Sequence, residues 1–213
     1  MRMAELSTAS GIPVATIKFY RREGVLGPGA PTGHPNQVSY TAAHVRRLAL
    51  IRSLVEVGGL SVAAVRDVLK AVDDPEVPLH STLGQTLEAV GLDSGAAPDD
   101  GFRADAAARI DAVMAARGWA VDSCAPARQA AVDVLATMLR LAGDRLAPAL
   151  PAYVAAVEAI AEADLATLDA PGDRETLVET AVIGTVLGDH LLAALRRLAQ
   201  EHVSAHRFAE HQE

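Results

Sequence analysis

The sequence predicts a mainly α-helical protein: a winged helix-turn-helix with a small two-stranded wing, a short dimer-type helix, and an all-α C-terminal bundle. Half of the 213 residues are hydrophobic and only 3% are aromatic. The prevailing Ala, Leu and Val side chains favour helices around a core of small aliphatics. Apolar residues recur at helical spacing through most of the chain. A Gly- and Pro-rich loop at 27–36 interrupts this pattern where a wing would fit.

Charge is divided unevenly along the chain. Residues 1–60 hold seven basic and three acidic side chains, whereas the other 153 residues hold 12 basic and 24 acidic ones. A net charge of −8 argues against a generic nucleic-acid binder, but a basic head on an acidic body fits one DNA-facing surface. Ordinary variation in surface charge is the alternative explanation.

The first helix pair is predicted at 3–10 and 13–23, joined by a turn at 10–12. Pro13 suits a helix start, because its missing N–H costs nothing in the first turn. Val14, Ile17 and Tyr20 share one face. The opposite face is small, polar, cationic and aromatic, which suits the major groove of DNA; it carries Ala15, Thr16, Lys18, Phe19 and Arg22. Two short helices joined at a glycine occur in many chains, so a plain helical subdomain is the alternative on spacing alone.

The wing and two further helices complete the predicted head. Strands are expected at Val25-Leu26 and at 37–40, on either side of the loop. Thr41 is a plausible N-cap for a helix over 42–57. Its apolar side chains Val45, Leu48, Ile51, Leu54 and Val55 face inward, and Arg46, Arg47 and Arg52 face outward. Ser61 caps a last helix that runs to about residue 72.

These motifs together resemble the DNA-binding domain of MerR-family transcription regulators over roughly residues 3–72. The resemblance rests on Leu6–Pro13, Thr16–Tyr20, Gly24–Pro28, Tyr40-Thr41, Leu48, Ile51, Val57-Gly58, Leu60-Ser61-Val62 and Val65. In the family, the second of these runs forms the recognition helix and the third begins the first wing. The DNA contacts expected here come from Ala15, Thr16, Lys18, Phe19, Arg22, Gln37, Ser39, Tyr40, Arg46 and Arg47.

One position departs from the family. Relatives usually carry an arginine two residues before the wing tyrosine, where this chain has Val38. The wing is therefore expected to contact phosphate through His34, Gln37, Ser39 or backbone N–H groups.

Three regions are predicted: a DNA-binding domain at 1–72, a linker with a short dimerisation helix at 73–101, and an α-helical effector or interaction domain at 102–213. The expected dimer stripe is Leu79, Leu83, Leu87 and Val90. In the family a long helix here makes an antiparallel coiled coil, but this stripe spans only about three turns. Other surfaces of the C-terminal body are therefore expected to share the dimer contact.

The C-terminal body is predicted to hold helices at 102–117, 126–147, 152–168 and 173–208. A few large side chains could line an effector pocket between them: Met114, Trp119, Met138 and Tyr153. Filling of the core is the commoner fate of such residues and stays open as the alternative.

Catalytic and metal chemistry find little support in the sequence. Cys124 is the single cysteine, which disfavours both a thiolate metal sensor and a disulfide. His202 and His206 are four apart and Asp189-His190 are adjacent, yet both pairs suit ordinary helix faces. No phosphate-binding glycine loop or hydrolase motif is visible. No apolar run is long enough for a bilayer span and no secretory signal is visible, so a cytoplasmic protein without cofactors and without membrane association is expected.

The resemblance implies a transcriptional regulator rather than an enzyme. It would bind double-stranded DNA as a homodimer on a pseudo-palindromic promoter site and act on RNA polymerase indirectly, by twisting and bending the promoter. A small organic ligand is a possible effector. The alternative is an adaptor whose α-helical body binds another protein.

Overall fold

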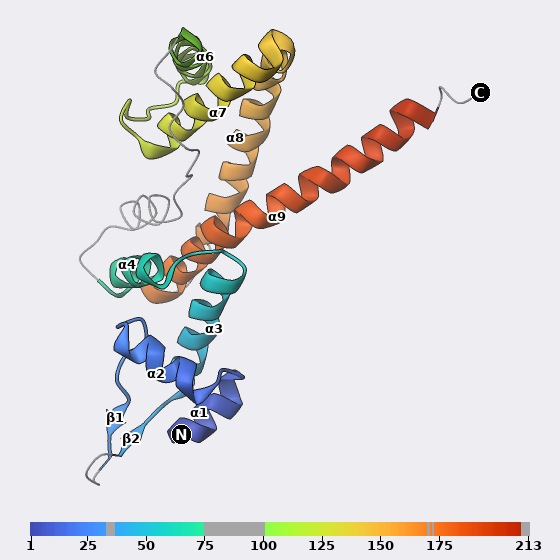
Figure 1. Ribbon diagram of the computed structural model, residues 1–213. Coiled ribbons are helices and arrows are strands. Elements are labelled where there is room, and N and C mark those ends of the chain that lie inside the picture. The colour runs from blue at the N-terminus through green and yellow to red at the C-terminus, as the bar shows by residue number, and fades with distance from the viewer. Residues whose placement is uncertain (33–36, 75–100, 170, 172, 210–213) are drawn as a thin grey trace. The chain divides into compact units, whose positions relative to one another are not determined.

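The computed structural model describes residues 1–32, 37–74, 101–169, 171 and 173–209. The chain divides into two compact units, one of Met1–Val90 with Asp173–Glu213 and one of Gly91–Gly172. We call them the head unit and the helical unit, and each is described by itself. The described part is mostly helical, with one two-stranded antiparallel sheet (Figure 1), which confirms the predicted fold class.

The head unit begins with the predicted helix-turn-helix, α1 (Met3–Ser10) and α2 (Val14–Arg22). Leu6 and Ile17 are fully buried between these helices and the rest of the head. Ser7 Oγ donates a hydrogen bond of 2.7 Å to the Ile12 carbonyl oxygen, which fixes the turn between the two helices. Tyr20 lies in the same core, and burial raises the pKa of its hydroxyl, with the nearby Glu56 adding to the rise.

The wing differs from its prediction in its first strand. The sheet pairs β1 (Ala30–Pro31) with β2 (Val38–Ser39), in the register Ala30 opposite Ser39 and Pro31 opposite Val38. The strand predicted at Val25-Leu26 was wrong. The N–H of Val25 instead donates to the Tyr20 carbonyl and the N–H of Gly24 to that of Arg21. This is a Schellman motif, which needs a left-handed residue after the helix, and Gly24 has φ +77°.

Two further helices, α3 (Ala42–Glu56) and α4 (Val62–Asp73), follow the wing. Ser61 caps α4 as predicted, since its Oγ accepts from the Ala64 N–H at 3.1 Å. Of the predicted inward residues of α3, Leu48, Ile51 and Leu54 are fully buried, while Val45 and Val55 pack partly buried at the edge of the core.

The C-terminal helix α9 (Arg174–Ala209) completes the core of the head. Val178, Val182 and Val186, four residues apart, are fully buried in the same cluster as the side chains of α3 and α4. The approach is close at Gly58, where a Cβ would lie 2.3 Å from Val186 Cγ1. The domain expected at 102–213 therefore does not form one compact unit, because α9 packs with the head.

The helical unit contains α6 (Gly101–Arg117), α7 (Pro126–Ala142) and α8 (Leu150–Ala166). Short 3-10 turns lie at Gly143–Arg145, Ala147–Ala149 and Thr167–Asp169. The helix predicted at 126–147 therefore ends early, at Ala142. The core of the unit is small and aliphatic: Ala106, Ile110, Val132, Leu135, Ala136 and Leu139. Ion pairs fasten α6 to α7, among them Arg103 with the buried Asp133 at 2.8 Å.

Candidate DNA-binding surface

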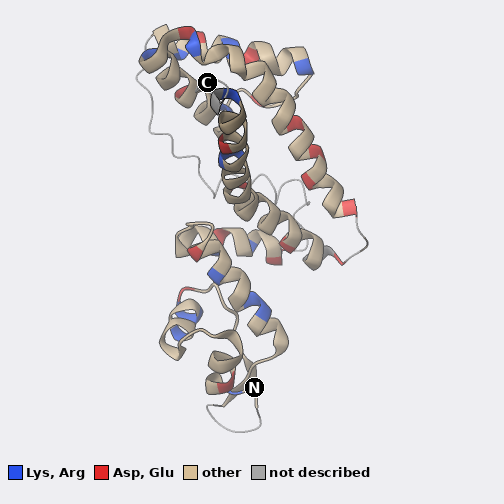
Figure 2. Ribbon diagram, turned by 90° about the vertical axis from the view of Figure 1, so that its right-hand side faces the viewer, with Lys and Arg blue, Asp and Glu red and all other residues tan. Residues whose placement is uncertain are grey.

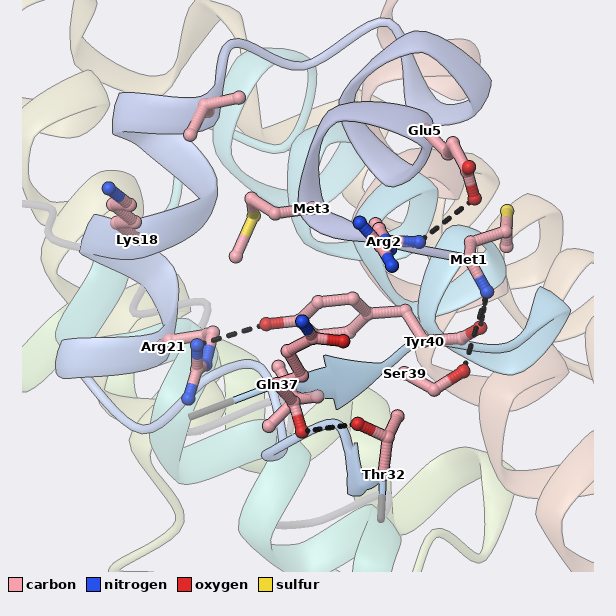
Figure 3. Close-up of a pocket in the computed structure, with 12 residues that line it drawn as sticks. Met1, Arg2, Met3, Glu5, Lys18, Arg21, Thr32, Gln37, Ser39 and Tyr40 are labelled. Atoms are coloured by element: carbon pink, nitrogen blue, oxygen red, sulfur yellow. Dashed lines mark hydrogen bonds between the residues drawn. The ribbon is translucent and has the colours of Figure 1, made fainter. Parts of the chain in front are cut away.

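A shallow groove of about 680 Å³ lies between α1, α2 and the wing (Figure 3). Three cationic side chains and one carboxylate line it: Arg2, Lys18, Arg21 and Glu5. Thr32, Gln37, Ser39 and Tyr40 contribute from the wing. The groove therefore combines positive charge with hydrogen-bonding groups, the composition that phosphate and base edges require.

Cationic side chains reach the groove from α2 because of helical spacing. Val14, Lys18 and Arg21 follow one another at four and three residues, so they share a face that lines the groove. Lys18 is exposed. Basic residues also lie on α3, coloured blue on the ribbon in Figure 2, and Arg46 and Arg52 are exposed there. The head thus presents positive charge on several of its elements.

Tyr40 is the buried anchor of the groove. Its side chain is 1% exposed, and its backbone pairs with that of Met1 through two N–H···O bonds of 2.8 Å. The His44 ring meets the Tyr40 ring edge-on at a centroid distance of 5.2 Å. Arg21 Nη1 donates to the Tyr40 hydroxyl at 2.9 Å (Figure 3). Tyr40 therefore joins α1, α2 and the wing.

The wing offers exposed polar groups above this anchor. The Gln37 carbonyl oxygen accepts from the N–H and from the hydroxyl of Thr32, each at 3.1 Å. These bonds hold the backbone across the wing and leave the Gln37 side chain exposed. Ser39 is half-buried, with Oγ 3.5 Å from the Met1 nitrogen. His34 lies outside the described residues.

Other predicted contact residues lie elsewhere on the head. Ala15 is exposed and Thr16 is half-buried. Phe19 packs against the core, and the guanidinium carbon of the exposed Arg22 lies 5.4 Å from the centroid of its ring. None of these four side chains lines the groove between α1, α2 and the wing.

Arg46 and Arg47 line a second hollow of about 260 Å³ together with Gly24–Gly27, Asp73 and Glu179. Arg47 forms an ion pair with Asp73 at the end of α4, and only 18% of its side chain is exposed. The structure thus brings Lys18, Gln37, Ser39 and Tyr40 together, and engages Arg47 inside the head.

Three further residues line the groove and are not among the contacts expected from the sequence: Arg2, Arg21 and Thr32. Arg21 could have been found from its spacing, because it lies three residues after Lys18 on the same face. Val14 was expected on the inward face and Lys18 on the outward face, and Arg21 was assigned to neither. Arg2 and Thr32 belong to no periodic segment, and only the fold places them.

The expected dimer stripe Leu79, Leu83, Leu87 and Val90 lies outside the described residues. The four residues considered for an effector pocket lie in the helical unit. Met114 packs against its core, and Trp119 Nε1 donates to Glu158 Oε1 at 2.9 Å. Met138 is half-buried and Tyr153 is half-exposed.

Among the described residues, no group of three or more His, Cys, Asp or Glu side chains could hold a metal ion. Cys124 is exposed, and the His202 and His206 rings meet edge-on at a centroid distance of 4.5 Å.

One helix, over Thr176–Arg207, has the length and apolar composition of a membrane span. The apolar character of its first turns is explained by the fold, because Val178, Val182 and Val186 are buried in the head core.

Comparison with known proteins agrees with the geometry of the head. Residues 1–72 match the family described as MerR HTH family regulatory protein. The crystal structure of SCO5550, a proposed transcriptional regulator from Streptomyces coelicolor A3(2), is similar over 98% of each chain, with 35% sequence identity and a TM-score of 0.71. No curated protein matches the chain. The likeness to the solved structure spans the helical unit and α9 as well as the head. The chain thus belongs to the MerR family and is a DNA-binding transcriptional regulator.

Proposed function

We propose that this regulator binds a pseudo-palindromic promoter site as a homodimer. The observation that carries the proposal is the groove between α1, α2 and the wing. Three cationic side chains line it, Arg2, Lys18 and Arg21, but only one carboxylate, that of Glu5. In helix-turn-helix proteins the second helix enters the major groove and the first crosses the backbone. With that docking, Lys18 meets base edges or phosphate, while Gln37 and Ser39 meet the backbone beside the site.

The test is salt-dependent binding of the purified protein to the DNA upstream of its own gene. We expect specific binding whose logarithmic affinity falls steeply with the logarithm of salt concentration. Lys18→Ala should weaken it by roughly 5- to 30-fold, the loss of about 1–2 kcal/mol given by one charged contact to DNA. Equal affinity of the wild type for random DNA would contradict the regulator and favour an adaptor.

A homodimer is supported by the second half of α9. This helix has 36 residues, or about 54 Å at 1.5 Å per residue, and its first turns are docked in the head. Beyond them Leu191, Leu195 and Leu198 are exposed, at spacings of four and three residues. Such an exposed apolar stripe is stabilised when another apolar surface covers it. A second copy fits, because a two-fold axis presents the same stripe to itself.

The expected stripe Leu79, Leu83, Leu87 and Val90 remains a prediction for the same dimer contact. Two heads held at a fixed separation would then set the spacing of the half-sites. Bending and twisting such a site costs of order 1–6 kcal/mol, which contacts from both heads can offset. RNA polymerase would be affected indirectly, through the shape of the promoter DNA.

A small organic effector is proposed for the helical unit, around Met114, Trp119, Met138 and Tyr153. The support is chemical: these are among the few large side chains in an alanine-rich unit, and Trp119 already offers its N–H to the carboxylate of Glu158. Binding sites in helix bundles combine apolar walls with a few polar groups. A cytoplasmic location is proposed as well, since promoter DNA is the ligand.

A further inference from the structure

The structure assigns Arg21 as a phosphate-binding residue beside the wing, with Tyr40 as the residue that positions it. This rests on the proposed docking of α2 and the wing on DNA. It adds Arg21 to the DNA contacts expected from the sequence.

Arg21 lies where α2 faces the wing. It lines the groove together with Lys18, three residues earlier on α2, and with Gln37, Val38 and Ser39 across the gap. Figure 3 shows its side chain next to the hydroxyl end of Tyr40, with the hydrogen bond between them dashed. A DNA strand that follows α2 and passes under the wing meets this position next to Lys18.

Tyr40 fixes the guanidinium of Arg21 in two ways. Its hydroxyl accepts from Nη1 at 2.9 Å, and its ring centroid lies 5.9 Å from the guanidinium carbon. Tyr40 itself has little freedom, since it is 1% exposed and its backbone is paired with that of Met1. An arginine side chain loses conformational entropy when a ligand orders it. Here much of that ordering precedes binding, which favours affinity.

The charge of Arg21 stays available to a ligand. Its hydrogen-bond partner is a neutral hydroxyl, and among the described residues no carboxylate pairs with it. A guanidinium has five N–H donors in a planar fork, so one bond to Tyr40 leaves a pair of donors for an anion. That fork matches two oxygens of a phosphate. Arg47 is the contrasting case in the same head, because its guanidinium is paired with Asp73.

The experiment measures the affinity for the upstream DNA and its salt slope for Arg21→Gln, Arg21→Lys, Tyr40→Phe and the double variant Arg21→Gln/Tyr40→Phe. Arg21→Gln should weaken binding by roughly 5- to 20-fold on specific and scrambled DNA alike, and lower the salt slope by about 0.9. Arg21→Lys should restore the slope and only part of the affinity. Tyr40→Phe keeps the ring and should cost roughly two- to five-fold, but nothing further in the Arg21→Gln background.

The matched control is Arg145→Gln, which removes one exposed positive charge in the helical unit and should leave the slope unchanged. Thermal melting verifies that each variant is folded, and Arg21→Gln alone suffices if Tyr40→Phe is not. An unchanged salt slope in Arg21→Gln, a loss confined to one base position, or fully additive effects with Tyr40→Phe would each overturn the assignment. Wild-type binding and its weakening by Lys18→Ala would still stand in those cases, so failure of the proposed function is a distinct result.

Discussion

At the scale of single residues, the structure separates arginines that face a ligand from arginines that hold the head together. Arg21 rests on a neutral tyrosine, whereas Arg47 is mostly buried and paired with Asp73 at the end of α4. Both are basic residues of the same head, and of the two only Arg47 is expected from the sequence to reach DNA. Charge and helical face alone do not distinguish them, because the partner of Arg47 lies 26 residues away and comes close only through the fold.

Arg47→Ala should therefore act mainly on stability. The change removes an ion pair and the buried stem of the side chain, together worth about 1 kcal/mol. We expect a melting temperature lower by a few degrees and little change in DNA affinity once the protein is folded. The matched control is Arg46→Ala, which removes the same charge from the exposed neighbouring position. Equal melting temperatures for the two variants, with weaker binding by Arg47→Ala, would show that Arg47 serves DNA instead.

At the scale of elements, α9 is the helix whose place the sequence did not indicate. Its apolar periodicity predicted a helix over 173–208, close to Arg174–Ala209 as observed. Periodicity does not identify the partner of a helix, however. Docking on α3 and α4 depends on three buried valines and on a glycine at position 58, more than 100 residues away along the chain. The misplaced first wing strand has a local cause, since the helix-ending motif at Gly24 uses the N–H group of Val25.

The start of α9 should give the head a pH-dependent stability. Asp173 Oδ1 accepts from the Thr176 N–H at 2.8 Å, and hydrogen bonds from Thr176 hold the pKa of this carboxyl below its ordinary value. A lowered pKa in the folded state stabilises the fold above the ordinary pKa of aspartate, about 3.9. That stabilisation is lost as the pH falls through the lowered value.

Asp173→Ala should lower the melting temperature at pH 7, because the first turn of α9 loses its cap. Asp173→Asn should retain most of the cap and show a flatter dependence of melting temperature on pH between about 5 and 2. Asp169→Asn, at another exposed aspartate, is the control and should follow the wild type. A wild-type slope in Asp173→Asn would contradict the role of this carboxylate.

At the scale of the whole molecule, the second half of α9 should decide the oligomeric state. The triple variant Leu191→Glu, Leu195→Glu and Leu198→Glu places like charges along the proposed seam. We expect the wild type to sediment as a dimer at micromolar concentration and the variant as a folded monomer. DNA affinity should then fall sharply, since each head binds its half-site alone.

The control for this experiment is an equal load of charge on other exposed aliphatic positions, Leu141→Glu, Val157→Glu and Leu165→Glu in the helical unit. These changes should leave the dimer intact. A monomeric wild type would contradict the homodimer. Dissociation by the control set and not by the α9 set would assign the contact to the helical unit.

The docking of α9 makes the head discontinuous in the sequence. The head is built from two stretches of sequence, and the helical unit is the segment inserted between them. A fragment ending at residue 72 would lack Val178, Val182 and Val186 and would leave the faces of α3 and α4 that they cover open to water. For protein engineering, a chimaera should exchange the insertion between α4 and α9 and keep the C-terminal helix of the parent. In such a design both ends of the inserted unit are tethered to one DNA-binding head, so a change in the distance between those ends would act on α4 and α9 together.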